Sequence, residues 1–239
     1  MPNSADDLLR SQHDSYRTVF DQTIAEVTDL PTRAAAVQTI SDLATCIDAL
    51  SNRPEKEVFE LAIREYQYAL IAACHGSYRQ AFSALRLSFE LWLAAISFSG
   101  AEKELRAWRA RKQDIVWGKL IGEDAGVLSK NFVSLFCPSL EGNTTSFRVI
   151  AERFYRECSE YVHGNHHTHV NLPVNLVYDQ AAFREWCNKV ETFKLVCLFC
   201  FTYRYAELIP MSGLAVIGAP IGDTLGHLAE VRQLAVVPA

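Results

Sequence analysis

The sequence predicts an all-α protein, and three observations support that prediction. Apolar side chains recur three or four residues apart over most of the 239 residues, which is the spacing of amphipathic helices. The chain has no series of short alternating runs separated by turn residues, which a β-sandwich or barrel would show. It also lacks a long internal repeat and a charged linker, so we expect one helical domain.

Residues 1–50 are expected to form an N-terminal helical pair that packs on the core. The first helix would span residues 5–28, with Ser4 as its cap and acidic residues in its first turn. Pro31 would start the second helix. The positions expected to be buried are Leu9, Tyr16, Phe20, Ile24 and Val27 in the first helix, and Val37, Ile40, Ala44 and Ile47 in the second.

Residues 51–209 are expected to form an antiparallel helical bundle. Its first helix would follow a cap at Ser51 or Asn52, with Pro54 near its start, and would end at His75–Gly76. Apolar residues recur without interruption at i, i+3 and i+4 spacing and mark its buried face. The residues on that face are Val58, Phe59, Ala62, Tyr66, Ala69, Leu70 and Ala73.

The next helix, opened by Ser77, is apolar nearly all round, which is typical of a central helix in a bundle. Its polar residues are not scattered but lie at spacings of four, three and four, which makes one narrow stripe. The stripe consists of Arg79, Ser83, Arg86 and Glu90. We interpret it either as a solvated face or as a polar lining for a site on a neighbouring helix.

The second half of the bundle is less regular. A charged helix over residues 101–112 leads into an uncertain stretch, and a helix from residue 143 or 144 to His163 follows. Residues 166–178 are expected to be loop or short extended structure, and residues 179–208 to form the longest helix. Residues 210–239 are expected to be a short apolar C-terminal appendage. The residues expected to interrupt the helices are Gly164, Asn165, Pro210 and Gly213.

Charge and cysteine usage limit the class of protein. A net charge of −5 removes the broad basic footprint of a protein that coats nucleic acid, although one phosphate can still be bound locally. Seven cysteines, an odd number lying mostly in apolar helical patterns, indicate a reducing compartment. The first residues show no basic and apolar leader pattern, so we expect no secretory leader, and the apolar run Leu195–Phe201 is too short to span a membrane. We expect a cytoplasmic protein without a membrane partner.

One pair of residues suggests chemistry. Arg156 and His163 are seven positions apart, so on a helix their side chains leave the same face about 10 Å apart along the axis. An arginine at that spacing can hold the oxygens of a phosphodiester and stabilise the charge that develops in the transition state. A histidine can move a proton to or from a ribose oxygen. This scheme needs no metal and no cofactor.

The segment from Tyr155–Arg156 to His163–Gly164, at the end of a late helix, resembles the R-x4-6-H motif of the HEPN superfamily. The resemblance covers about residues 55–209 as helix order. Its members are all-α bundles, often dimeric, and many are metal-independent RNases of toxin–antitoxin, phage-defence and CRISPR-associated systems. The bare spacing occurs readily by chance, so the helix end and the bundle around it give the motif its weight.

The resemblance implies a homodimeric endoribonuclease that leaves 2′,3′-cyclic phosphate ends, with Arg156 as the phosphate clamp and His163 as the general acid and base. RNA would be the substrate, and an antitoxin or a defence-system protein would be a partner. This chain departs from the family at Glu157, where catalytic members often carry Asn, Asp or His directly after the arginine. An acid is a less natural neighbour for a phosphate.

Each of these residues also has a structural interpretation. Arg156 could pair with Glu152 and Glu160, each four positions away, and His163 could simply cap its helix. Ser159 lies one turn from both and would be a hydrogen-bonding helper. On the functional interpretation, two further residues would orient Arg156 or line its cleft. These are Arg86 and Glu90.

Other clusters point to no separate chemistry. Four histidines lie close together, but no cysteine or acid stands beside them at the spacing of a zinc site. A Cys-x-x-Cys pair lies inside an apolar helix, which indicates core packing and not redox activity. These clusters are His163, His166, His167 and His169, and Cys197 with Cys200. The alternatives to an RNase are a non-catalytic HEPN-like module that binds protein or nucleic acid, and a helical scaffold in which the motif is incidental.

Overall fold

The structure, a computed structural model, describes residues 4–163 and 165–234. It is built from helices, and the described residues contain no strand, which confirms the predicted all-α class. In chain order the helices are α1 (Ala5–Ala25), η1 (Val27–Asp29), α2 (Leu30–Asp48), α3 (Lys56–Cys74), α4 (Tyr78–Gly100), α5 (Glu102–Arg109), α6 (Trp117–Leu120), α7 (Lys130–Phe136), η2 (Pro138–Asn143), α8 (Thr144–Val162), α9 (His166–Asn171), α10 (Gln180–Tyr205), α11 (Met211–Leu225) and α12 (Ala229–Gln233).

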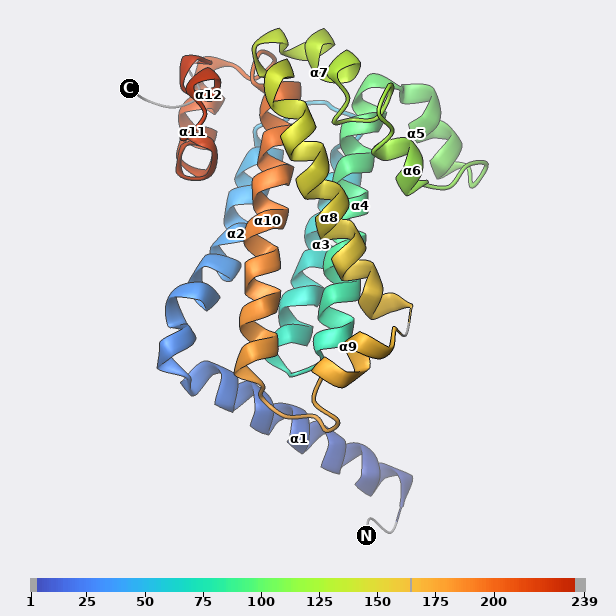
Figure 1. Cartoon of the computed structure of the whole chain (residues 1–239), viewed down its shortest axis with the longest axis vertical. Coiled ribbons are helices and arrows are strands. Elements are labelled where there is room, and N and C mark those ends of the chain that lie inside the picture. Colours follow the sequence, from blue (N-terminus) through green and yellow to red (C-terminus); the bar gives the residue numbers. More distant parts are fainter. Residues whose placement is uncertain (1–3, 164, 235–239) are drawn as a thin grey trace.

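Four long helices, α3, α4, α8 and α10, lie side by side and run in alternating directions (Figure 1). Helix α4 packs against the other three, as predicted for the central helix. It is long and apolar enough to cross a membrane, but 67% of its apolar window is buried inside the bundle. That burial is the pattern of a core helix, since a lipid-facing span would expose the same surface.

The predicted core face of α3 is confirmed, because all seven of its predicted residues are buried. The helix ends at His75, and Gly76 follows with a φ of +74°. A Cβ atom on Gly76 would lie 2.8 Å from the backbone oxygen of Val177, in the segment that leads into α10. Glycine therefore allows both the sharp α3–α4 turn and the close approach of that segment.

The N-terminal pair packs differently from the prediction. Ser4 does cap α1, accepting a hydrogen bond from the Asp7 N–H at 3.1 Å. However, α1 lies across one end of the bundle (Figure 1) and buries only Val19 and Thr23. Its predicted core face is largely exposed, with Leu9 at 62%. Periodicity shows that a helix has an apolar face, but it does not show that the bundle is long enough to cover it.

In α2 the buried face is also rotated from the predicted one. Val37 is half exposed, whereas Ala36, Leu43 and Cys46 are buried. The buried side includes Asp42, whose carboxylate lies 2.5 Å from Lys194 of α10. A charge buried with a partner on another helix cannot be recognised from local hydrophobicity, so the apolar pattern found only part of the buried side, where Ile47 is buried and Ile40 partly buried.

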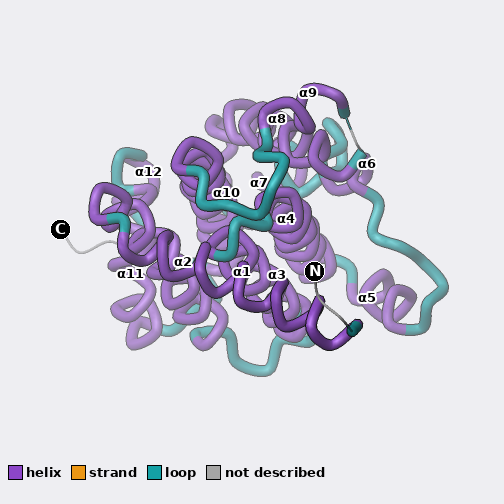
Figure 2. Tube along the Cα trace, turned by 90° about the horizontal axis from the view of Figure 1, so that it is seen from below, coloured by secondary structure: helices purple, strands orange, loops and turns teal. Residues whose placement is uncertain are grey.

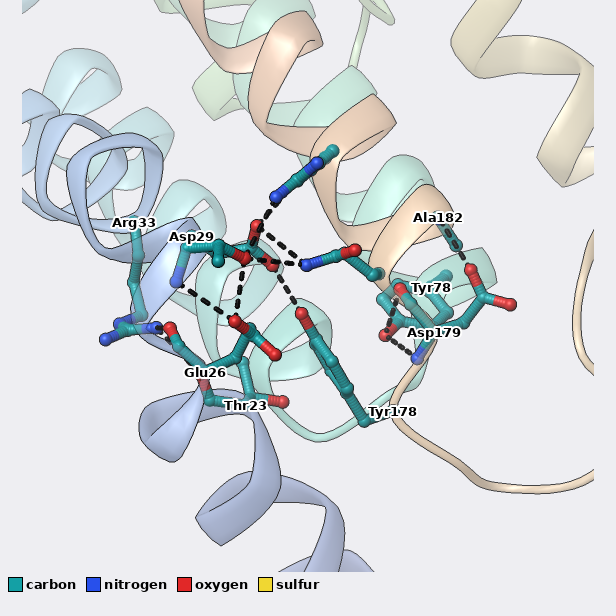
Figure 3. A network of polar contacts seen from close by, with 11 residues as sticks. Thr23, Glu26, Asp29, Arg33, Tyr78, Tyr178, Asp179 and Ala182 are labelled. Atoms are coloured by element: carbon teal, nitrogen blue, oxygen red, sulfur yellow. Dashed lines mark hydrogen bonds and ion pairs between the residues drawn. The ribbon is translucent and has the colours of Figure 1, made fainter.

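A polar network fixes the joint between α1 and α2 (Figure 3). The Arg33 guanidinium donates to the backbone oxygens of Thr23 and Ile24 at 2.7 and 3.1 Å, and so satisfies the C-terminal end of α1. The buried Asp29 carboxylate accepts a hydrogen bond from Arg184 of α10 at 2.6 Å and another from the Tyr178 hydroxyl. The network thus ties the N-terminal pair to the start of α10.

Two other segments correct the prediction. Residues 166–171 form the short helix α9 where loop or extended structure was expected, and Gly164 lies outside the described residues. The C-terminal appendage is helical, since α11 continues through Gly213 and Pro220, and residues 235–239 lie outside the described residues. Pro210 is the N-cap of α11 and separates it from α10, so Gly213 lies in the first turn of α11 and interrupts neither helix.

The core is rich in aromatic residues and thiols. Trp92, Trp186 and Tyr66 are among its largest enclosed side chains. All seven cysteines are buried and none forms a disulfide, and the pair at positions 197 and 200 lies in the packed interior of α10. The prediction that this pair is core material is confirmed.

Candidate functional site

Helix α8 carries the predicted motif, and its bounds agree with the sequence. Asn143 precedes it as the N-cap, and His163 is its C-cap residue, with its N–H donating to the Ser159 oxygen at 3.2 Å. One stripe of the helix faces the core. The buried residues of this stripe are Phe147, Ala151, Phe154 and Cys158. The stripe fixes the rotation of α8 and therefore sends Arg156 to the opposite, outer side.

Arg156 and His163 are both exposed on that outer side. Over the described residues, neither side chain has a hydrogen-bond or ion-pair partner. Glu152, one of the two acids expected to neutralise Arg156, lies 3.6 Å from Arg148 instead. The backbone of His163 caps the end of α8, as the structural interpretation expected. Its imidazole is exposed to solvent. Seven residues of helix separate the two groups by about 10 Å along the axis.

The polar stripe of α4 contacts α8 at both of its ends, although Arg79 itself is exposed. Arg79 donates from Nε to the Tyr161 oxygen at 2.9 Å and from its terminal nitrogen to the Val162 oxygen at 3.3 Å. Ser83 donates back to the Arg79 oxygen at 2.8 Å. A guanidinium at the C-terminal carbonyls of a helix stabilises that end. Arg79 therefore holds the last turn of α8, to which His163 is attached.

Further along the same stripe, Arg86 and Glu90 bind Tyr155, the residue before Arg156. The Tyr155 hydroxyl donates to Glu90 at 2.8 Å, and the Arg86 guanidinium lies 4.5 Å from the Tyr155 ring centre. Trp117 of α6 stacks on the same ring at 3.7 Å, nearly parallel. Burial is the main cause that raises the pKa of Tyr155. These contacts fix the α8 backbone next to Arg156, and Arg86 and Glu90 lie 3.6 Å apart as an i, i+4 pair.

Glu157 and Ser159 are occupied elsewhere. The Glu157 carboxylate turns towards α10 and lies 2.7 Å from Lys189 and 2.8 Å from Arg153. Burial raises the pKa of Glu157, but the hydrogen bonds and charges of Arg153 and Lys189 outweigh it, and the net shift is downward. The Ser159 hydroxyl donates to the Tyr155 oxygen at 2.6 Å. The acid that follows the arginine is thus directed away from the outer face of α8.

The histidine cluster is only partly described. The side chain of His166 is exposed, while those at positions 167 and 169 lie outside the described residues. Among the described side chains, no three His, Cys, Asp or Glu residues converge as metal ligands would. The site therefore rests on the two motif residues and on the α4 side chains that support their helix.

Two cavities flank α10, away from the motif. One, of about 470 Å³, lies between α2, α10 and α11, and the other, of about 450 Å³, lies between α8 and α10. Neither is lined by Arg156 or His163. The motif thus occupies open helix surface, and a substrate there would have to be covered by a further surface to exclude water.

Sequence reasoning missed two contributors. Trp117 lies in a stretch without periodicity, and its stacking on Tyr155 joins segments 38 positions apart. The capping role of Arg79 depends on the way α4 meets α8, although its stripe was recognisable. Comparison with known proteins finds no matching family model, no matching curated protein and no matching solved structure.

Proposed function

We propose that the chain is a metal-independent endoribonuclease in which Arg156 binds the scissile phosphate and His163 transfers the proton. The observation that supports this most directly is the freedom of both side chains. Each is exposed on the outer side of α8, two turns apart, with no polar partner among the described residues. The other two arginines on α8, Arg148 and Arg153, are engaged in ion pairs.

The proposed reaction is transesterification. The ribose 2′-oxygen loses its proton to a neutral imidazole and attacks phosphorus, so that the P–O2′ bond forms as the P–O5′ bond breaks. The leaving 5′-oxygen takes a proton from an imidazolium, which leaves a 2′,3′-cyclic phosphate and a 5′-hydroxyl. Arg156 would hold the nonbridging oxygens and stabilise the charge that develops on them.

The surroundings support this assignment in two ways. Arg79 fixes the end of α8 behind His163, and Tyr155 is held by Arg86 and Glu90 beside Arg156. Such support for a reactive group limits its motion, and reaction rates depend steeply on position. The orientation of Glu157 towards Lys189 removes its carboxylate from the proposed phosphate position. The resemblance to HEPN proteins further implies that a second protomer would cover the open surface.

The test compares matched residues on the same surface. Purified full-length protein is incubated with end-labelled single-stranded RNA in EDTA, as wild type, Arg156→Ala and His163→Ala, with Arg153→Ala and His166→Ala as controls. We expect both motif variants to lose at least about a hundredfold in rate, since a general acid or base contributes roughly 10²–10⁴. The controls should remain within about threefold, and the products should carry 2′,3′-cyclic phosphate. Equal activity in the motif and control variants would refute the proposal.

A non-catalytic protein-binding module is the second candidate, and the exposed apolar face of α1 favours it. Leu8, Leu9 and Ile24 are each close to half exposed or more. Wild-type protein that cleaves no RNA would remove the first candidate. A self-association constant that falls on Leu9→Glu, measured by analytical ultracentrifugation, would then assign the α1 face to a protein contact.

A further inference from the structure

Basic residues are concentrated in one segment of this acidic protein. Residues 103–119 contain six basic and two acidic side chains, a net charge of +4, while the whole chain carries −5. The segment covers most of α5, the loop after it and most of α6. Both views place the α5–α6 connection at the periphery of the molecule (Figures 1 and 2). We call residues 109–119 the basic loop.

The charges in this region fall into two groups. Arg106 is paired with Glu102 at 2.6 Å, and Arg109 with Glu57 at 2.5 Å, so both contribute to the fold. The others are exposed and have no ion-pair or hydrogen-bond partner for their side chains in the described part of the chain. These free cations are Lys103 on α5 and, in the basic loop, Arg111, Lys112 and Lys119.

Arg111 occupies a position where local energetics favour glycine. It follows the C-cap of α5 with a φ of +56°, and the Lys112 N–H donates to the Ala107 oxygen at 2.9 Å. This is the turn that commonly ends a helix, and its left-handed residue is usually Gly because a Cβ atom is strained there. An exposed arginine kept in a strained conformation, with no contact for its guanidinium, suggests a role outside the fold.

The basic loop is joined directly to the proposed site. It ends in α6, where Trp117 stacks on Tyr155 at 3.7 Å, and Tyr155 precedes Arg156 on α8. Lys119 lies two residues after Trp117 in α6 and is exposed. Figure 1 shows α6 next to α8, with α8 running on from there towards its His163 end, and Figure 2 shows α5 farther from α8 than α6 is. The basic loop is therefore connected to the residue beside Arg156 through the Trp117–Tyr155 contact.

We infer that the basic loop binds the phosphate backbone of the RNA strand next to the scissile bond, through Arg111, Lys112 and Lys119. The inference rests on the proposed function for its substrate. Single-stranded RNA is the form that fits, because in-line attack by a 2′-oxygen requires a backbone free to leave helical geometry. Contacts of this kind follow the backbone without reading sequence. The carboxylate of Asp114, which is exposed in the same loop, repels phosphate and so weakens these contacts.

The experiment separates binding from cleavage. The His163→Ala protein is titrated against fluorescein-labelled single-stranded RNA and followed by anisotropy from 50 to 300 mM salt, with and without the substitutions Arg111→Ala, Lys112→Ala and Lys119→Ala. We expect the triple variant to weaken binding at least about fivefold and to lower the slope of log K against log salt by about 2, at roughly 0.7 per phosphate contact. Arg10→Ala with Arg17→Ala, two exposed cations on α1, is the control and should change the slope little.

Two single substitutions test the assignment with opposite signs. Arg111→Gly removes backbone strain together with the charge, so we expect a higher Tm and weaker RNA binding. Asp114→Asn should tighten binding by about twofold or more and leave the Tm unchanged. If a variant lost affinity because its fold was damaged, its Tm would fall. These two single variants therefore still test the inference if the triple variant folds poorly.

The outcomes distinguish this inference from the proposed function. Cleavage that requires Arg156 and His163, combined with an unchanged salt slope in the triple variant, would overturn the inference alone. RNA binding that depends on the basic loop in a protein whose cleavage ignores the motif would overturn the RNase proposal alone. If vesicles of phosphatidylserine and phosphatidylcholine bind through the loop and RNA does not, the RNA assignment is wrong.

Discussion

Gly76→Ala tests how the α3–α4 turn and the segment before α10 constrain each other. The residue has a φ of +74°, and an added Cβ atom would meet the Val177 oxygen at 2.8 Å and a Val19 methyl at 3.0 Å. A side chain in the left-handed conformation costs about 1–2 kcal/mol. The contact with a backbone oxygen adds about 1–2 kcal/mol, because backbone must move to relieve it. We expect a total loss of about 2–4 kcal/mol in the free energy of unfolding.

The assay is urea denaturation followed by circular dichroism, with linear extrapolation of the free energy to water. For a chain of this length the same loss lowers the Tm by about 5–15 °C. Gly118→Ala is the matched control, since nothing lies within 4 Å of its added Cβ atom and its φ is not positive. It lies in α6, where alanine should stabilise by about 0.5–1 kcal/mol. A Gly76→Ala protein as stable as wild type would refute the reasoning about this turn.

Two further predictions concern α8. Because the net pKa of Glu157 is lowered in the fold, its stabilising effect is complete above the ordinary value of 4.5 and is lost as pH falls through the lower folded value. Glu157→Gln should therefore flatten the acid side of the stability profile below about pH 4.5, measured by urea titration at several pH values. Arg79→Met removes the donor to the Val162 oxygen, so hydrogen exchange in the last turn of α8 should accelerate about two- to fivefold, with Gln80→Met as the unaffected control.

Sequence periodicity predicted the interior of the bundle well because there the local pattern and the tertiary contacts agree. In α3 every predicted core residue is buried, since neighbouring helices enclose that face. In α1 the pattern is equally regular, but the helix lies beyond the end of the bundle and Leu9 stays exposed. In α9 the sequence offered turn residues and histidines with no apolar rhythm, so a helix of a single turn and a half gave no signal.

The candidate site was predictable only in part. Arg156 and His163 lie on one face of a helix because they are seven residues apart, and this could be predicted from their spacing alone. Whether Glu152 would neutralise Arg156 depended on side-chain rotamers, and Glu152 lies 3.6 Å from Arg148 instead. The stacking of Trp117 on Tyr155 needed the fold, because no local pattern connects two residues so far apart in the chain.

The complete burial of the thiols has a practical consequence. Reagents such as maleimides attack an accessible thiolate, and burial both blocks access and, at Cys158, raises the pKa to about 12. A single cysteine introduced at Val149, which is 55% exposed on α8, would therefore take up a spin label selectively. In a dimer that pairs the two α8 surfaces, the distance between two such labels would be short, and in a monomer no such distance would exist.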